Sequence, residues 1–286
     1  MAVYSDQYNY IFFANPNTAS KAIAKTLKEK LDGKRIPGPK ADTGAVKVRP
    51  HHCTYTQLVD SGLMTAEKLE GLFKFTGVRN PYDQMVSKYV KHCQRLENNP
   101  ENYPWAREGA ADDADFDDDD DEDEKPKAKG KGKAAGGKAK DPAKAAAKGK
   151  AATSEAKVKG KGPSSLGWVL AKPNEQINAQ QADFLNWLRL MDLKYTKVGK
   201  MENGPLEFLA HADYVIRFEA LQDGFAEVVK RIGAPEPVEI IEFNITKARE
   251  EAPKKKKSYK DYYTPEAQAI VAKMFGPVIE RFGYQF

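Results

Sequence analysis

Cysteine and histidine are scarce in this 286-residue chain, which contains two cysteines and four histidines. Cys53 and Cys93 form no CxxC pair and have no histidines at zinc spacing, so the sequence predicts neither a metal site nor a disulfide framework. Long apolar runs are also lacking. No stretch approaches the ~18 apolar residues of a membrane span, and the polar first ten residues do not resemble a secretion signal. We therefore expect a soluble, cytoplasmic protein.

Charge is abundant but unevenly distributed. Residues 112–124 include 11 acidic residues out of 13, and residues 125–161 contain 13 lysines. Because this tract has few apolar residues to offset the entropy of ordering, we predict a disordered, low-complexity insertion over 108–163. The acidic block attracts the lysines and so competes with nucleic acid for them. This favours a solvated insertion in a surface loop, which costs little stability. The alternative is nucleic-acid binding through the lysines.

Strand and helix patterns alternate on both sides of this tract. Short apolar runs predict strands over 10–14, 73–78 and 214–218. Helical periodicity and capping residues predict helices over 21–31, 65–73, 82–96, 178–191 and 221–232, with a last helix beginning at Thr264. The alternation predicts one α/β domain, formed by residues 1–107 and 164–286. Its central, mostly parallel sheet is flanked by helices.

The loop after the first predicted strand is a candidate anion site. Residues 16–21 (PNTASK) are small and polar, and they lead into a helix whose N-terminal N–H groups and positive dipole end point at the loop. Thr18 and Ser20 can add hydroxyl donors. An ordinary strand–turn–helix connection has the same pattern. The sequence lacks the GxxxxGK[ST] loop of ATP-using kinases, which argues against that enzyme class.

A second candidate segment follows the strand at 73–78. Arg79 stands at the carboxyl end of this strand, where open α/β sheets bind ligands, and Ser87 lies about two helical turns further on. A planar guanidinium and a hydroxyl suit a phosphate group. Alternatively, Arg79 caps the following helix or pairs with Asp83. We interpret Arg217 and Glu219 as an ion pair or a brace of the sheet.

Together these segments resemble the nucleotide-binding motifs of sulfotransferases that use 3′-phosphoadenosine-5′-phosphosulfate (PAPS). The resemblance is to the branch that includes carbohydrate sulfotransferases and their soluble bacterial and viral relatives. It rests on residues 16–22 (PNTASKA) and most specifically on residues 78–89 (VRNPYDQMVSKY). Further similar segments are 213–221 (DYVIRFEAL), 259–266 (YKDYYTPE) and 282–286 (FGYQF).

The resemblance implies a P-loop-like fold and a specific reaction. In that reaction a sulfuryl group passes from PAPS, the co-substrate, to a hydroxyl acceptor such as a carbohydrate, without a metal. By the resemblance, Arg79 and Ser87 hold the 3′-phosphate, and residues 258–263 lie near the nucleotide. The 5′-phosphosulfate is cradled by the loop residues Pro16, Asn17, Thr18, Ala19, Ser20, Lys21 and Ala22.

The reaction also needs a group that accepts the proton of the acceptor hydroxyl, and histidine is the usual one near neutral pH. His51 and His52 fall in a loop between the two motifs. The resemblance favours His52, because related sequences often have a histidine followed by a small residue and threonine at this place. The alternative is a solvent-facing histidine pair. We interpret His92 and His211 as structural.

Asn17 departs from the pattern of the family, which usually has lysine directly after the loop proline. That lysine is thought to neutralise charge on the bridging oxygen as sulfate leaves. Lys21, in the same loop, can reach the sulfate instead, and Ala22 replaces a common serine. A second hypothesis is therefore a nucleotide-binding protein with impaired catalysis, in which Asn17→Lys raises turnover.

Overall fold

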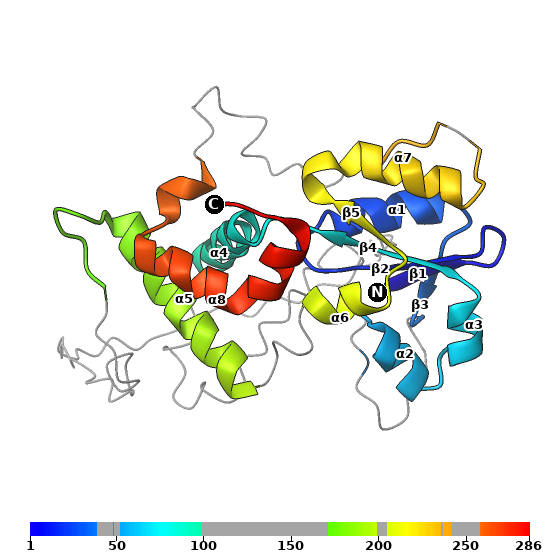
Figure 1. Ribbon diagram of the computed structural model, residues 1–286, viewed down its shortest axis with the longest axis horizontal. Helices are drawn as coiled ribbons and strands as arrows, with labels where there is room; N and C mark the ends of the chain where they lie inside the picture. Colours follow the sequence, from blue (N-terminus) through cyan, green and yellow to red (C-terminus); the bar gives the residue numbers. More distant parts are fainter. Residues whose placement is uncertain (39–47, 49–51, 99–170, 199–204, 236, 242–257) are drawn as a thin grey trace, which may run out of the picture. The chain divides into compact units, whose positions relative to one another are not determined.

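The computed structural model describes residues 1–38, 48, 52–98, 171–198, 205–235, 237–241 and 258–286 (Figure 1). All of them belong to one unit of the chain, which consists of Met1–Tyr103 and Val169–Phe286. The insertion predicted over 108–163 lies outside the described residues. Among the helices that are described, none is both long and apolar enough to span a bilayer.

A five-stranded sheet lies at the centre of this unit. Its strand order is β3-β1-β2-β4-β5. The strands are β1 (Ala2–Ser5), β2 (Tyr10–Phe13), β3 (Lys34–Ile36), β4 (Phe73–Val78) and β5 (Tyr214–Arg217). The three strands predicted from the sequence are confirmed as β2, β4 and β5, and they pair in parallel. However, β1 pairs antiparallel with both β2 and β3. The sheet is therefore mixed, but β1 alone runs against the other four strands, so the expected mostly parallel arrangement holds apart from β1.

The two strands that the sequence did not predict, β1 and β3, are both short. Ala2 and Val3 of β1 are fully buried, but the strand lies next to the polar residues Asp6 and Gln7, so no apolar run marks it. At the sheet edge, β3 has the sequence KRI with Lys34 exposed. Charged residues are typical of edge strands, where they discourage pairing with another chain.

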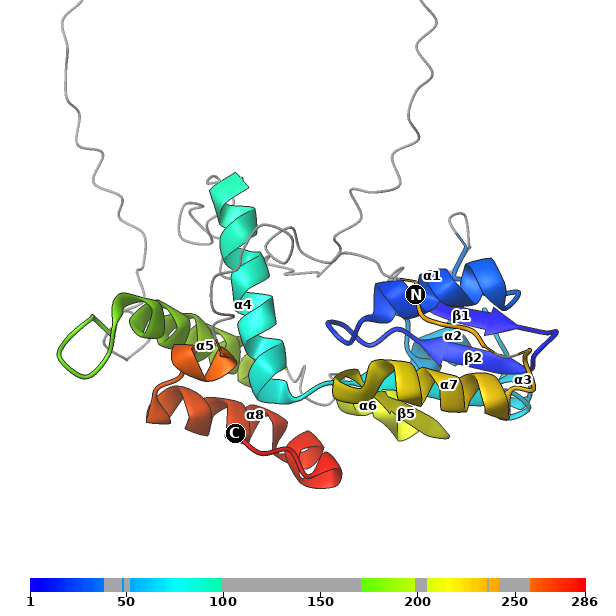
Figure 2. The ribbon, with the colours of Figure 1, turned by 90° about the horizontal axis from the view of Figure 1, so that it is seen from above.

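Helices cover both faces of the sheet (Figures 1 and 2). They are α1 (Ser20–Lys30), α2 (Tyr55–Asp60), α3 (Ala66–Glu70), α6 (Pro205–Ala210) and α7 (Leu221–Arg231). Because successive residues of a strand point to opposite faces, Tyr10 and Phe12 pack with α1 and α7, whereas Ile11 and Phe13 pack with α2, α3 and α6. Burial on both faces explains why β2 is a continuous apolar run rather than an alternating one.

Two long helices begin at sequence signals that the structure confirms. In α8 (Pro265–Phe282), the Thr264 hydroxyl accepts a hydrogen bond from the Ala267 N–H at 3.1 Å, and Pro265 occupies the first helical position. Similarly, α4 (Pro81–Asn98) begins after Asn80, whose side-chain oxygen accepts from the Tyr82 N–H at 3.0 Å. Such caps satisfy N–H groups that have no partner inside the helix.

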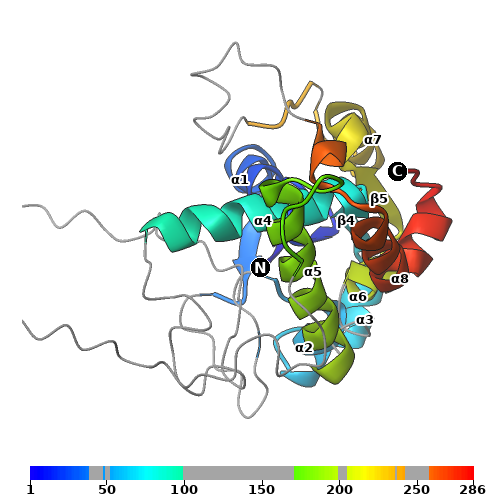
Figure 3. The ribbon, with the colours of Figure 1, turned by 90° about the vertical axis from the view of Figure 1, so that its left-hand side faces the viewer.

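A group of helices packs around one side of α4. It consists of α5 (Ala179–Val198), α8 and the short 3-10 helix η6 (Tyr259–Tyr262), and α5 lies alongside α8 (Figure 3). Tyr89 of α4 contacts Phe184, Trp187 and Tyr262, with ring centroids 5.2, 5.5 and 6.2 Å apart. These contacts fix the rotation of α4 about its axis and determine which of its residues are turned away from α5 and η6.

Candidate functional site

Three neighbouring parallel strands end at the same edge of the sheet. The loop 14–19 follows β2, Arg79 follows β4, and Phe218, in the short 3-10 helix η4 (Phe218–Ala220), follows β5. The carboxyl ends of parallel strands are where open α/β sheets bind ligands. The structure therefore brings together the two segments that the sequence singled out.

The backbone of the loop adopts an unusual conformation. Asn17 and Ala19 have φ angles of 61° and 60° although neither is glycine. For an L-residue with a Cβ the left-handed region costs roughly 1–2 kcal/mol, so the surrounding contacts must hold it. Such strained positions concentrate at sites that clamp ligands.

The contacts that hold the loop engage three successive carbonyl groups. The Thr18 hydroxyl donates to the Asn15 carbonyl at 2.8 Å, Gln84 of α4 donates to the Pro16 carbonyl at 2.9 Å, and Arg79 donates to the Asn17 carbonyl at 3.3 Å. The acceptors of the loop backbone are thus satisfied within the protein, which favours an anion rather than a cation as the ligand of this loop.

The N-terminus of α1 lies at the end of the same loop. Its N-cap residue, Ala19, makes no side-chain capping bond, and the first turn of α1 contains no acidic residue. The first N–H groups of an 11-residue helix and the positive end of its dipole therefore remain without a side-chain acceptor from the cap. This is the arrangement in which helix N-termini bind phosphate and sulfate groups.

Gly77 of β4 allows the loop to lie directly against the sheet. Its carbonyl accepts from the side-chain amide of Asn15 at 2.8 Å. A Cβ at position 77 would lie 2.6 Å from the Thr18 hydroxyl oxygen, which is far inside van der Waals contact. A side chain at position 77 is thus excluded by the close approach of the loop.

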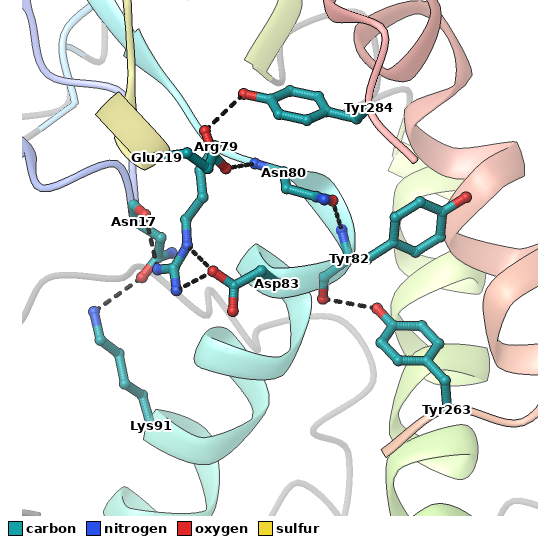
Figure 4. Close-up of polar contacts among 9 residues, drawn as sticks. All are labelled: Asn17, Arg79, Asn80, Tyr82, Asp83, Lys91, Glu219, Tyr263 and Tyr284. Atoms are coloured by element: carbon teal, nitrogen blue, oxygen red, sulfur yellow. Dashed lines mark hydrogen bonds and ion pairs between the residues drawn. The ribbon is translucent and has the colours of Figure 1, made fainter. Parts of the chain in front are cut away.

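One face of α4 is turned towards the loop (Figure 4). Asp83 binds Arg79, and the ammonium of Lys91 donates to the side-chain oxygen of Asn17 at 2.9 Å. Residues four apart in a helix lie on one face, so Ser87 lies between Asp83 and Lys91 on this side. The structure therefore brings Ser87 to the same side of α4 as the loop contacts.

The guanidinium of Arg79 links β4, α4 and the loop. It donates to the Asp83 carboxylate from Nε at 2.8 Å and from a terminal nitrogen at 2.7 Å, and it lies over the Phe218 ring at 4.2 Å. Its side chain is 13% exposed. The ion pair with Asp83, which the sequence offered as an alternative, is thus present. Its bond to the Asn17 carbonyl also places Arg79 beside the loop.

His52 belongs to another segment of the chain and lies beside Ala14, the first residue of the loop 14–19. Its Nδ1 is 2.8 Å from the carbonyl oxygen of Ala14, which directly follows β2. Because a carbonyl can only accept, Nδ1 carries the proton in this bond, and a neutral ring then has its lone pair on Nε2. His51 lies outside the described residues.

The remaining loop residues differ in what they offer a ligand. The Thr18 hydroxyl is buried and used inside the loop, so the Thr18 side chain is a structural element of it. Ser20 and Ala22 are buried in the first turn of α1, and Lys21 between them is half-buried. Backbone N–H groups are therefore the principal donors that this turn can present to an anion.

The segment 258–263 packs against the start of α4. The Tyr263 hydroxyl donates to the Tyr82 carbonyl at 2.9 Å, and burial raises the pKa of Tyr263, which keeps it neutral. Its ring also contacts Phe286 at 5.1 Å. In the structure Tyr263 stabilises the first turn of α4, which carries Asp83.

Arg217 and Glu219 brace the end of the sheet, as the sequence suggested. Glu219 accepts from the Asn80 N–H at 2.7 Å and from the Tyr284 hydroxyl at 3.2 Å (Figure 4). Arg217 donates to the Phe282 carbonyl at 2.9 Å. Both residues connect the end of the sheet to the C-terminal part of the chain: Arg217 to the last residue of α8 and Glu219 to Tyr284 after it.

Three residues at the site were not recognised in the sequence: Asn15, Gln84 and Lys91. All three act through contacts between segments far apart in the chain. Only Lys91 had a usable signal, because it follows Ser87 by four residues and so shares its helix face. The described residues contain no group of three or more histidine, cysteine, aspartate or glutamate side chains that could hold a metal ion.

Fold and site define an α/β protein with an uncapped helix N-terminus and Arg79 at the carboxyl ends of its parallel strands, and with Lys91 of α4 beside the loop. Comparison with known proteins agrees with this class. A model of the sulfotransferase family matches residues 2–285, essentially the whole chain. No curated protein and no solved structure matches. The chain therefore belongs to the sulfotransferase family, a family of transferase enzymes.

Proposed function

We propose that this protein transfers a sulfuryl group from PAPS to a hydroxyl group of an acceptor, with a carbohydrate as the first acceptor class to test. The observation that carries the proposal is the loop 14–19. Its carbonyls are satisfied from within, and it leads into an uncapped helix that has no acidic residue in its first turn. This arrangement fits the phosphosulfate end of the donor.

The proposed donor-binding residues divide into two groups. The loop and the first turn of α1 hold the 5′-phosphosulfate through backbone N–H groups, with Lys21 beside them. Arg79 and Ser87 hold the 3′-phosphate, which distinguishes PAPS from ordinary adenine nucleotides. A 3′-phosphate at this place joins or replaces Asp83 as the partner of the Arg79 guanidinium, whose fork matches either anion.

The proposed base is Nε2 of His52. When bound, PAPS supplies an activated sulfuryl group on a phosphate leaving group. The chain's own part is to accept the proton from the acceptor hydroxyl at Nε2, while the bond from Nδ1 to the Ala14 carbonyl fixes the ring. Loose transition states of this kind are stabilised mainly by positioned donors and charges.

Calorimetric binding of 3′-phosphoadenosine-5′-phosphate (PAP), the desulfated product, tests the donor site. We expect wild type to bind PAP at least about tenfold more tightly than 5′-AMP or ATP, because a charged hydrogen-bonded contact to the 3′-phosphate contributes ~1.5–3 kcal/mol. Arg79→Ala should abolish this preference. A wild type that binds none of these nucleotides, or that prefers ATP, would contradict the proposal.

Arg217→Ala is the matched control for Arg79→Ala. It removes the same side chain from the end of the neighbouring strand. Arg217 donates to the Phe282 carbonyl at the end of α8 and lies over the rings of Phe282 and Tyr284. We expect its PAP preference to match that of wild type. PAP formation from PAPS with a panel of oligosaccharides and phenols then separates an active enzyme from a protein that only binds the nucleotide.

A further inference from the structure

Asn17 lies half-buried at the bend of the loop and carries no charge. Its φ angle of 61° places it in the left-handed region, and its carbonyl is held by Arg79. Its side-chain oxygen accepts from the ammonium of Lys91 at 2.9 Å (Figure 4). The Lys91 ammonium therefore places a positive charge beside position 17, where the loop residue itself is neutral.

The source of this charge is fixed by the geometry of α4. Lys91 lies one helical turn beyond Ser87 and two beyond Asp83, on the face that contacts the loop. The aromatic contacts of Tyr89 on the other side of α4 fix the rotation of the helix. The approach of Lys91 to Asn17 thus follows from the packing of α4.

We infer that Lys91 provides the cation that faces the 5′ end of the nucleotide donor, with Asn17 orienting its ammonium. This inference rests on the proposed function and extends it to a residue outside both sequence motifs. An ammonium has three N–H donors, so it can hold the amide oxygen of Asn17 and a phosphate oxygen together.

This position suits the charge that develops during transfer. The bond between sulfur and the bridging phosphate oxygen breaks, and its electron pair stays on that oxygen. A new bond forms between sulfur and the acceptor oxygen, whose proton passes to Nε2 of His52. The Lys91 ammonium stabilises the additional negative charge on the 5′-phosphate, which is greatest in the product.

Binding of two probe nucleotides isolates this role without any turnover. PAP carries both phosphates, whereas adenosine 3′-phosphate lacks the one that Lys91 faces. Lys91→Gln keeps a hydrogen-bond donor but removes the charge. We expect it to weaken PAP binding about tenfold while adenosine 3′-phosphate binds as in wild type, and Lys91→Arg to weaken PAP binding less than about threefold.

Lys88→Gln is the matched control, because Lys88 lies one turn before Lys91 on α4 but contacts Tyr195 of α5. It should leave the affinities for both nucleotides unchanged. If Lys91→Gln weakens neither nucleotide or both equally, or if Lys91→Arg is as weak as Lys91→Gln, the inference is wrong while the proposed function stands. If wild type binds adenosine 3′-phosphate but not PAP, or neither, the proposed function itself fails.

Discussion

At the scale of single residues, His52 offers the cleanest separation of binding from chemistry. In His52→Asn the amide nitrogen can replace Nδ1 in the bond to the Ala14 carbonyl, but nothing replaces Nε2. We expect kcat for PAP formation from PAPS to fall by about 100-fold or more, while the Kd for PAP stays the same. Stopped assays and calorimetry measure the two quantities separately. An unchanged kcat would remove His52 from the mechanism.

The candidate site also shows which residues a sequence can reveal. Arg79 and the loop residues stand in segments whose order along the chain already suggested an anion site. Lys91 and Gln84 gain their roles only from the tertiary contact between α4 and the loop. The spacing of four residues from Ser87 placed Lys91 on the same helix face, but a lysine on an amphipathic helix ordinarily faces solvent, so this signal alone could not show its contact with Asn17.

At the scale of elements, the close packing of β4 on the loop predicts that Gly77→Ala is harmful. The new Cβ would lie 2.6 Å from the Thr18 hydroxyl oxygen and 3.0 Å from its Cβ, so the loop must move. We expect a loss of ~1–3 kcal/mol in the free energy of unfolding and at least about tenfold weaker PAP binding. Chemical denaturation and calorimetry measure these effects.

Gly71→Ala is the control for this substitution. Gly71 ends α3 with ordinary backbone angles, and its added Cβ would come no closer than 3.5 Å to the Lys68 carbonyl oxygen. Its PAP affinity should equal that of wild type. Equal PAP affinity in Gly77→Ala would show that the loop tolerates displacement and that its packing on β4 does not shape the site.

The elements that could be predicted are those with a strong local pattern. β2 and β4 are buried strands with apolar runs, β5 has a short apolar run at the sheet edge, and α8 begins at Thr264 and Pro265 as expected. β1 and β3 escaped prediction because their partners, rather than their own sequences, make them strands. The direction of β1 therefore could not be inferred from the sequence. For the same reason the sequence did not show that the sheet is mixed.

At the scale of the whole molecule, buried tyrosines and a buried thiol limit stability at high pH. Burial raises the pKa of Tyr10, Tyr89 and Tyr263, and it raises the pKa of Cys53 to about 12. The folded state then keeps protons that the unfolded state releases. The ordinary pKa values, which apply to the unfolded chain, are 9.0 for cysteine and 10.0 for tyrosine. Below them these groups do not lower the free energy of unfolding, and above them it falls as the pH rises.

We therefore expect the free energy of unfolding to fall by about 1.4 kcal/mol per pH unit for each such group above its ordinary pKa. Denaturant titrations between about pH 8 and about pH 11 measure the slope. Tyrosinate absorbance should show part of the tyrosines ionising only as the protein unfolds. A free energy of unfolding that stays constant across this range would contradict the burial of these side chains.

The order of strands has a consequence for the protein during its synthesis. β1, β2 and β3 all lie within the first 36 residues, so this part of the sheet can form while the rest is still being translated. β5 can pair with β4 only after the ribosome has added the charged tract and reached residue 217. Until then β4 has an open edge that offers its backbone to other nascent chains. Pauses in translation between these two strands should therefore lower the yield of folded protein more than pauses elsewhere.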